Sequence, residues 1–451
     1  MSTFEITRPF LEELEEKIIQ ADKTAISHLL ADLHYGDISA LLYETNPEQA
    51  KFVIESLEKE DAAEILSDLE EDFRVELVKQ FDSTALSSYA DFMDSDDAVD
   101  MLKEQPIQTR EEVIALMRDR QKARHIIHLL PYDEDTAGGL MAKEYIKANI
   151  NWDVKQCIEE VRRQAEKVDK IYSIYVVNDE GILKGRVSLK KIILSPDHTK
   201  IADIYEADII AIESYLYQED VAEIMQRYDL EALPVVNVKG KLLGRITIDD
   251  IIDVITEQAE YERQVMSGIS SDVEEDDDIW KLTKARLPWL IIGMVGGIAG
   301  AQFIGLFEQD LILLPAMAFF IPLITATGGN VGIQSSSIII QSLASKAVLK
   351  GAFQRIIKVF SVAIINGIVL SGIVFGANML LVGDIKLSLV VTCALFFVVI
   401  LASFTGTITP LVLARFKINP AFASGPFITT ANDLLGLAVY FLTARALYAL
   451  L

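Results

Sequence analysis

One acidic residue lies inside a long apolar stretch of the sequence, where its chemistry points to cation binding. Asp433 is the only carboxylate within the five apolar stretches that follow Trp280. Placing a carboxylate at membrane depth costs about 2.5–3.5 kcal/mol on insertion scales, so a compensating interaction is expected. These stretches contain no Lys or Arg at comparable depth and no basic ring that would suit an anion. We therefore predict that Asp433 binds a cation.

Two segments rich in Gly, Pro and polar residues interrupt the apolar pattern. They are residues 327–335, which contain two adjacent glycines, and residues 419–433. Irregular backbone at membrane depth is tolerated only where it is buried in protein or lines a wet cavity, so these segments are the predicted permeation path. The side chains expected to contact the waters of a hydrated ion are Asn330, Gln334, Thr429 and Asn432. The alternative interpretation is that the Gly and Pro residues only help the helices to pack.

The ionic charge that this site can balance depends on whether two copies of the chain form a dimer. In a homodimer with the path on its two-fold axis, two Asp433 carboxylates would face one ion and match a divalent charge. Mg²⁺ dehydrates reluctantly, which suits contacts made through its waters. The alternative is a transporter of another divalent cation such as Co²⁺ or Mn²⁺, for which Met294, Met317 and Met379 are softer ligands in the spans.

The charge distribution divides the chain near Trp280. The residues before it include 63 acids and 30 bases, a net charge of −33, whereas residues 280–451 include four acids and 11 bases, a net charge of +7. An acidic part joined to an apolar part with little charge indicates a cytosolic module followed by a membrane domain, and excludes a purely soluble enzyme. Nucleic-acid binding is disfavoured because no domain offers a basic surface.

Five apolar stretches in the second part are long enough to cross a bilayer. They comprise residues 287–307, 311–343, 356–381, 387–413 and 422–447. Basic residues lie before the first stretch, between the second and third, and between the fourth and fifth, whereas the alternate loops are acidic or mixed. The positive-inside rule therefore predicts a multi-pass protein of the cytoplasmic membrane, with a cytosolic N-terminal part and the C-terminus outside.

An internal repeat precedes the membrane part. Residues 174–188 align with residues 233–247 at a constant offset of 59 residues, and each copy reads as a strand, a Gly turn, a second strand and a helix. This pattern resembles a tandem pair of CBS domains, which are regulatory α/β modules. The resemblance implies an adenine nucleotide whose ribose is held by Thr247 and Asp250 in the second copy. The first copy has Ser188 and Lys191 instead, which does not fit that role.

The first 130 residues are polar and have a helical period. Short breaks such as 35–37, 46–47 and 105–106 predict a superhelical stack of short helices. The predicted architecture is therefore an all-α N-terminal domain (1–130), an α/β tandem CBS pair (131–260), a connecting helix with an acidic linker (261–286) and an all-α membrane domain of five transmembrane helices (287–451).

This order of domains, together with residues 328–335 and the segment from Pro420 to Gly436, resembles the MgtE family of Mg²⁺ channels and transporters. The resemblance covers nearly the whole chain. It implies a homodimer in the lipid bilayer, hydrated Mg²⁺ at Asp433, a plug-like helix near residues 262–286 and cytosolic domains that sense Mg²⁺. The sensor acids that it implies are Glu64, Asp96, Asp100, Glu219, Asp229, Asp250 and Asp253.

The charge of the cytosolic part predicts how such a sensor would act. Because this part has a net charge of −33, its acidic side chains repel one another when it becomes compact. Mg²⁺ bound between facing carboxylates would remove that repulsion. High internal Mg²⁺ should then favour a compact, closed state. A third hypothesis, a membrane-anchored adenylate-sensing scaffold or enzyme, would need a catalytic constellation. The sequence has no P-loop, nucleophile elbow or HExxH signature, so no enzyme activity is expected.

Overall fold

The computed structural model describes residues 6–166, 168, 170–271, 273, 277–344, 352–423 and 425–448. Its chain forms two compact units, Met1–Ile255 and Thr256–Leu451. The acids at 272 and 274–276 of the predicted linker lie outside the described residues, as do the loop bases Lys346 and Lys350.

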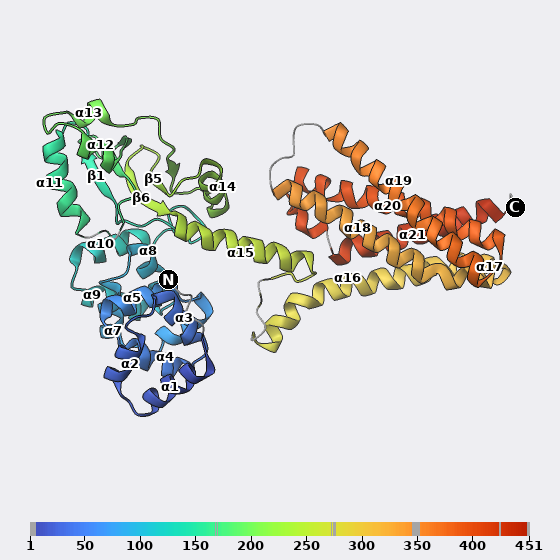
Figure 1. Ribbon diagram of the computed structural model, residues 1–451, viewed down its shortest axis with the longest axis horizontal. Coiled ribbons are helices and arrows are strands. Elements are labelled where there is room, and N and C mark those ends of the chain that lie inside the picture. Colours follow the sequence, from blue (N-terminus) through green and yellow to red (C-terminus); the bar gives the residue numbers. More distant parts are fainter. Residues whose placement is uncertain are drawn as a thin grey trace. The chain divides into compact units, whose positions relative to one another are not determined.

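The first unit begins with a stack of short helices (Figure 1). Their bounds are α1 (Arg8–Ile19), α2 (Lys23–Leu30), α3 (Tyr35–Tyr43), α4 (Pro47–Ile54), α5 (Lys59–Asp68), α6 (Glu71–Val78), α7 (Ser83–Ala90), α8 (Ser95–Lys103), α9 (Ile107–Leu116) and α10 (Arg120–Leu129). From α3 onward each helix contacts the one two positions later, for example α5 with α7 and α8 with α10. This pattern of neighbours is that of a superhelical stack, as predicted.

Local side-chain chemistry explains where these helices begin. The carboxylates of Asp22, Asp82 and Asp119 each accept a hydrogen bond from a backbone N–H in the first turn of the helix that follows. Asn46 and Gln49 form a reciprocal capping box at the start of α4. Such caps satisfy N–H groups that have no partner within the helix, and each contributes about 1 kcal/mol.

Two α/β repeats follow the stack, as the internal repeat predicts. The first contains β1 (Ile146–Asn149), α11 (Val154–Ala165), β2 (Ile174–Val177), β3 (Leu183–Val187) and α12 (Leu189–Leu194). The second contains α13 (Ile201–Ile204), β4 (Ile212–Glu213), α14 (Gln218–Tyr228), β5 (Ala232–Val236), β6 (Leu242–Thr247) and the start of α15 (Ile248–Met266). In each sheet the first pair of strands is parallel and the second antiparallel. The turns use Gly181 and Gly240, whose φ angles are +79° and +74°.

The second unit consists mainly of long apolar helices. Its elements are α16 (Ile279–Gly305), α17 (Glu308–Leu313), η1 (Pro315–Phe320), α18 (Ile321–Ala344), α19 (Ala352–Leu381), α20 (Ile385–Arg415), η2 (Pro420–Ala423) and α21 (Gly425–Tyr448). Among the described residues, five segments are long and apolar enough to cross a membrane, and they coincide with the predicted spans. A buried hydrophobic core of this unit lies between η1, α18, α20 and α21, and there the Tyr440 hydroxyl donates a 2.9 Å hydrogen bond to the Met317 carbonyl of η1.

The irregular backbone predicted at residues 327–335 is wrong, because α18 is helical there. The prediction for residues 419–433 is confirmed only in its first part, where residues 420–423 form the 3₁₀ helix η2, whereas residues 425–433 belong to α21. Before α18, the 3₁₀ helix η1 begins at Pro315. The glycines of residues 328–332 instead allow close packing of α18, as described below for the membrane site. The alternative interpretation, in which these small residues serve helix packing, therefore describes α18 better.

The connecting region also differs from the prediction. Residues 261–286 do not form a separate helix among the described residues, because α15 continues from the second repeat to Met266 and α16 begins at Ile279. Gly268, with a φ of +83°, follows the end of α15 and allows the chain to turn there.

Candidate functional site: an acidic cluster and a membrane carboxylate

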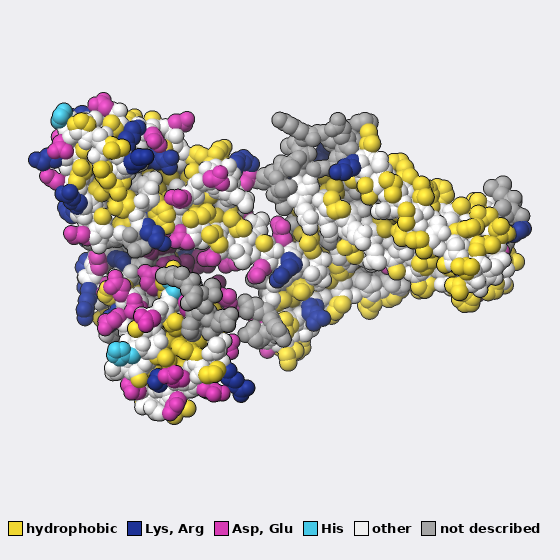
Figure 2. Space-filling model, in the orientation of Figure 1, with side chains coloured by type: hydrophobic (Ala, Val, Ile, Leu, Met, Phe, Trp, Pro, Cys, Tyr) yellow, Lys and Arg dark blue, Asp and Glu magenta, His cyan; other side chains and the backbone are white. Residues whose placement is uncertain are grey.

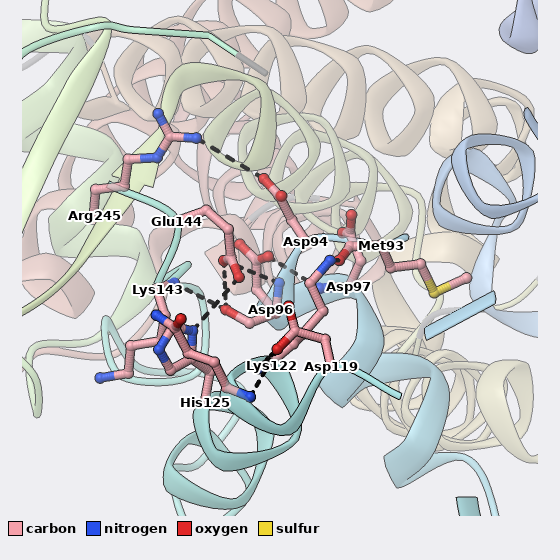
Figure 3. Close-up of polar contacts among 12 residues, drawn as sticks. Met93, Asp94, Asp96, Asp97, Asp119, Lys122, His125, Lys143, Glu144 and Arg245 are labelled. Carbon is pink, nitrogen blue, oxygen red and sulfur yellow. Dashed lines mark hydrogen bonds and ion pairs between the residues drawn. The ribbon is translucent and has the colours of Figure 1, made fainter. Parts of the chain in front are cut away.

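Two segments of the first unit, the start of α8 and the residues before β1, bring three carboxylates together (Figure 3). Asp94 is the residue before α8, Asp96 lies in its first turn, and Glu144 lies just before β1. One oxygen from each of these three side chains lies within 4.8 Å of the others, a spacing that would allow a single metal ion to contact all three. Carboxylate oxygens are the ligands that Mg²⁺ and Ca²⁺ prefer.

Glu144 is held in place by the start of α8. Its Oε2 accepts a 2.7 Å hydrogen bond from the Ser95 hydroxyl and a 3.1 Å bond from the Ser95 backbone N–H. His125 Nδ1 lies 3.7 Å from the other carboxylate oxygen. Burial acts to raise the pKa of Glu144, but His125 and the Ser95 hydrogen bonds lower it below the usual value. Glu144 therefore remains ionised beside the aspartates.

The pKa values of the aspartates in the cluster shift in the opposite direction to that of Glu144, upwards. Burial raises the pKa of Asp97 to about 8, with further contributions from the charges of Asp250 and Asp94. Burial also raises the pKa of Asp94 to about 6 and that of Asp250 to about 6. For Asp96, burial and the neighbouring carboxylates raise the pKa well above the usual value. The site therefore favours uptake of either protons or a cation.

Two basic side chains partly balance this charge, Arg245 of β6 and Lys122 of α10, and both act to lower the pKa of Asp94. The Arg245 guanidinium lies 3.9 Å from an Asp94 oxygen, over the Tyr172 ring at 5.0 Å, and donates a 3.1 Å hydrogen bond to the Lys170 carbonyl. It is almost completely buried. Lys143, next to Glu144, points its ammonium elsewhere, donating to the Leu243 carbonyl at 2.6 Å. Arg245 is thus the cation that faces the acidic cluster from β6.

The predicted sensor acids do not all meet at this cluster. Asp96 from α8 and Asp250 from α15 lie close enough for the charge of Asp250 to raise the pKa of Asp96. Asp253 is near Asp68 and Asp249. Glu64, Glu219 and Asp229 have exposed side chains on α5, on α14 and just after α14.

Asp100, one turn after Asp96 and Asp97 on α8, has a pKa raised to about 7 by burial, while Arg74 and Lys103 act to lower it.

Two residues of the cluster, Asp94 and Glu144, were not predicted from the sequence. Each lies close in sequence to a predicted feature. Asp94 precedes the acidic helix start, and Glu144 follows the residues Ala-Gly-Gly-Leu-Met.

The two residues predicted to hold a ribose, Thr247 and Asp250, are hydrogen-bonded to each other. Asp250 Oδ2 accepts hydrogen bonds from the Thr247 hydroxyl at 2.7 Å and from the Thr247 backbone N–H at 3.0 Å. In the first repeat, the Ser188 hydroxyl oxygen accepts a 3.3 Å bond from the Lys191 N–H. Both repeats therefore use this position to cap a helix.

In the second unit, Asp433 lies on α21 opposite a glycine of α18. A Cβ added at Gly329 would lie 3.8 Å from Asp433 Oδ1 and 3.1 Å from the Thr429 methyl carbon. Asp433 is half-buried, and among the described residues it has no hydrogen-bond or ion-pair partner. Thr429 directs its hydroxyl to the Gly425 carbonyl at 2.9 Å. An unpaired carboxylate among apolar helices is a feature that a bound cation would stabilise.

The remaining predicted side chains of the path fall into two groups. Asn330 and Gln334 are exposed and lie one turn apart on α18. Asn432 is only 2% exposed, accepts a 2.6 Å hydrogen bond from the Thr405 hydroxyl and packs on Gly332. This burial removes Asn432 from the surface of the subunit. The side chain joins α21 to α18 and α20, with its Nδ2 buried and without a hydrogen-bond partner among the described residues, and its contact with the waters of an ion stays a prediction.

The surface follows the same division as the sequence. Figure 2 shows charged side chains gathered on the first unit and mainly hydrophobic side chains over the long helices of the second. Large exposed hydrophobic residues continue along α16, α19 and α20. Lipid is the environment that such helices require.

Three family descriptions match the chain in the order that the fold displays. Residues 33–135 match the MgtE intracellular N domain, residues 137–196 and 201–257 match CBS domains, and residues 321–443 match a divalent cation transporter. The chain is similar to the magnesium transporter MgtE of Bacillus subtilis, with 30% identity over 93% of this chain and 95% of that protein. It is 32% identical to the magnesium transporter MgtE of Thermus thermophilus over 96% and 97% of the two chains.

The chain belongs to the MgtE family. A solved structure of a cytosolic domain of the Mg²⁺ channel MgtE in complex with ATP covers 54% of this chain and 99% of that one, with 32% identity and a TM-score of 0.51. The soluble part of a magnesium transporter covers 56% and 98% of the two chains, with 28% identity and a TM-score of 0.50. This chain of the MgtE transporter family is thus a multi-pass membrane protein with an intracellular N domain.

Proposed function

We propose that this protein carries Mg²⁺ across the cytoplasmic membrane into the cell. The observation that supports this most is the Asp433 carboxylate, half-buried on an apolar helix and without a partner among the described residues. The full-length relatives named as magnesium transporters support the choice of ion. The first unit is on the cytoplasmic side, and an odd number of crossings leaves the C-terminus outside.

The chemistry of the surrounding side chains suits a hydrated ion. Asn330 and Gln334 offer exposed amide oxygens one turn apart on α18, the helix that Asp433 faces. Amide and carboxylate oxygens can accept hydrogen bonds from waters that Mg²⁺ retains in its octahedral shell. Thr429 lies one turn before Asp433 on α21 and completes the polar lining that we propose.

The active form that we propose is a homodimer. One carboxylate carries a single negative charge and cannot balance a divalent ion at membrane depth. With the path on a two-fold axis, the second copy supplies a second Asp433, and the two side chains together match the charge of Mg²⁺.

The acidic cluster of the first unit is the regulatory site of this proposal. Asp94, Asp96 and Glu144 can share one ion, and Asp97 and Asp250 add negative charge to the same region. Because α8 and α15 contribute facing carboxylates, bound Mg²⁺ holds the helical stack against the second CBS repeat. A fall in internal Mg²⁺ releases that contact and favours the open state. Asp100, Glu64, Glu219, Asp229 and Asp253 are further regulatory ligands that we propose from the family resemblance.

An adenine nucleotide at the CBS pair is a second regulatory ligand in this proposal. The support is the related cytosolic domain solved with ATP, together with Thr247 and Asp250 in the second repeat. Nucleotide binding there would have to replace the hydrogen bonds between these two residues. Because Asp250 also faces Asp96, nucleotide and Mg²⁺ would influence each other.

Ion flux into liposomes tests the transport function. Purified full-length protein is reconstituted with a Mg²⁺-sensitive dye inside, and uptake is followed at low and at millimolar internal Mg²⁺. We expect Mg²⁺ uptake at low internal Mg²⁺ and several-fold slower uptake when internal Mg²⁺ is high. Uptake of Mn²⁺ or Co²⁺ with no uptake of Mg²⁺ would contradict the choice of ion, and no divalent flux at all would contradict the function.

A further inference from the structure

A cleft of about 660 Å³ lies within the second unit, at the beginning of α16. Its walls come from α16, from the segment that follows α15, and from the start of α21. The lining includes Ile269, Leu282, Arg286, Trp289, Leu290 and Gly293. The volume is in the range of small-molecule sites in proteins, which is about 300–1,000 Å³.

The walls are mainly apolar, and their polar side chains are those of Arg286 and Ser267. Trp289 is 8% exposed, and its ring stacks on Phe422 at a centroid distance of 6.2 Å, which fixes one wall. Leu290 is 63% exposed. Arg286 is exposed and makes no ion pair with any side chain of the described residues, whereas nearby Lys281 pairs with Asp277 at 2.7 Å. As far as the described residues show, the cleft therefore combines a guanidinium that makes no ion pair with uncovered apolar surface.

The cleft continues along the helix into open space. A Cβ added at Gly293 would have no atom within 4 Å, whereas one at Gly296 would clash with Thr430 of α21. Gly296 therefore allows α16 to pack against α21, whereas Gly293 faces open space at the cleft. An extended apolar chain could follow α16 past Gly293 towards the centre of the membrane.

The position of the cleft in the membrane selects its occupant. α16 is a candidate span, and its first turns hold Trp280 and Trp289 together with the basic residues Lys281, Lys284 and Arg286. Such residues occupy the headgroup level of a bilayer, here on the cytoplasmic side. At that depth the ligand with a negative headgroup and an apolar chain is a phospholipid. Arginine is well suited to bind a phosphate through paired hydrogen bonds.

We propose that this cleft binds an anionic phospholipid of the cytoplasmic leaflet, with the phosphate at Arg286 and the first part of an acyl chain along Leu290 and Gly293. The same cleft is bounded by Gly268, which packs on Pro426 at the start of α21. Because α21 carries Asp433, a lipid in the cleft stabilises the junction between the connecting segment and that helix. The binding itself does not depend on the transported ion.

Fluorescence of Trp289 tests the proposal in the full chain. Trp152 and Trp280 are replaced by Phe, which leaves Trp289 as the single tryptophan. The protein is reconstituted in liposomes in which bromine-labelled phosphatidylglycerol or bromine-labelled phosphatidylcholine forms the same fraction of the lipid. We expect phosphatidylglycerol to quench Trp289 several-fold more effectively. Equal quenching by the two lipids would overturn the proposed headgroup selectivity.

Matched variants separate this cleft from general attraction to the membrane. Arg286→Gln should abolish the preference for phosphatidylglycerol, and Lys284→Gln, with the same change of charge on the same helix, should keep it. Gly293→Leu should fill the cleft and reduce quenching by both lipids. Gly305→Leu, at the other end of α16 and also in open space, should not. Gel filtration confirms that each variant is folded.

Two further outcomes would count against the lipid. If soluble glycerol phosphate at millimolar concentration abolishes the preference, the cleft is a site for free phosphate and the proposal is wrong. If neither lipid quenches Trp289 in the parent protein, the cleft is covered by protein, for example by a second copy, and the proposal is wrong as well. A preference lost in Lys284→Gln and retained in Arg286→Gln would also contradict it.

Discussion

Ser95 donates both its hydroxyl and its backbone N–H to the carboxylate of Glu144, at 2.7 and 3.1 Å. These bonds join the first turn of α8 to the segment before β1, two elements that are 49 residues apart in sequence. The same serine oxygen accepts a 2.8 Å hydrogen bond from the Lys143 N–H. The contact fixes Glu144 as an ionised carboxylate next to Asp94 and Asp96. It makes the acidic cluster a junction between the helical stack and the CBS pair.

Removing the Ser95 hydroxyl should loosen this junction. A buried acceptor that loses its donor costs about 1–3 kcal/mol, although the Ser95 backbone N–H remains. For Ser95→Ala we expect faster hydrogen–deuterium exchange of residues 140–146, together with weaker protection of the site by Mg²⁺. Ser88→Ala, which removes only a local bond from a hydroxyl to the Ala85 carbonyl, is the control. Unchanged exchange in Ser95→Ala would show that Glu144 is held without this hydroxyl.

The raised pKa values predict how pH acts on the first unit. The pKa values of Asp94 and Asp250 are raised to about 6 and that of Asp97 to about 8, so the folded state binds protons that the unfolded chain releases. Their contribution to stability is therefore complete below pH 4 and is lost as the pH rises towards 8. Without Mg²⁺, resistance to protease should fall between pH 5.5 and pH 8.

Mg²⁺ should reverse that trend, because the ion replaces the protons of the same carboxylates. The protection that Mg²⁺ adds should be larger at pH 8 than at pH 5.5. Glu144 has a lowered pKa and loses its stabilising contribution only in more acidic solution, so it does not affect this window. An equal effect of Mg²⁺ at both pH values would indicate that it binds elsewhere.

Arg245 should weaken Mg²⁺ binding, because its guanidinium is a competing cation 3.9 Å from Asp94. We expect Arg245→Gln to lower the Mg²⁺ concentration needed for protease protection by several-fold. The matched control is Arg186→Gln. Arg186 is the equivalent residue of the first repeat, where it pairs with Glu206 in an exposed position. Weaker binding in Arg245→Gln would mean that the arginine organises the site more than it repels the ion.

Close packing of α18 against α21 predicts a strong effect of one methyl group. A Cβ at Gly332 would lie 1.9 Å from Asn432 Nδ2, whereas one at Gly372 would meet no atom within 4 Å. Overpacking of this kind costs about 1–3 kcal/mol. Gly332→Ala should therefore lower the temperature at which the detergent-purified protein aggregates, and Gly372→Ala should leave it unchanged. Equal behaviour of the two variants would contradict the proposed contact.

Much of this architecture could be predicted from residue patterns. The 59-residue repeat predicted two equivalent sheets, and even the irregularity of register recurs, after Val176 and after Val235. The five spans followed from hydropathy. The backbone of residues 327–335 could not be predicted in the same way. Glycines that suggest irregular structure in isolation are accommodated in a helix when a neighbouring helix packs against them, as Asn432 does on Gly332.

The acidic cluster was only partly predictable for a similar reason. Asp96 and Asp250 were identified through the family resemblance, but Asp94 and Glu144 depend on a tertiary contact. Nothing in the local sequence indicates that Glu144 meets the start of α8. The burial of Asn432 was missed because its neighbour Asp433 is half-buried and unpaired, and adjacent residues on a helix point in directions that differ by about 100°.

Mg²⁺ flux through an Asp433→Asn variant tests the central claim most directly. The variant removes the charge and keeps the shape of the side chain, and Glu308→Gln, an exposed acid of the same unit, is the matched control. In liposomes at low internal Mg²⁺, we predict that Asp433→Asn lowers Mg²⁺ uptake at least tenfold while Glu308→Gln conducts like the parent protein. Full Mg²⁺ uptake by folded Asp433→Asn would contradict the account.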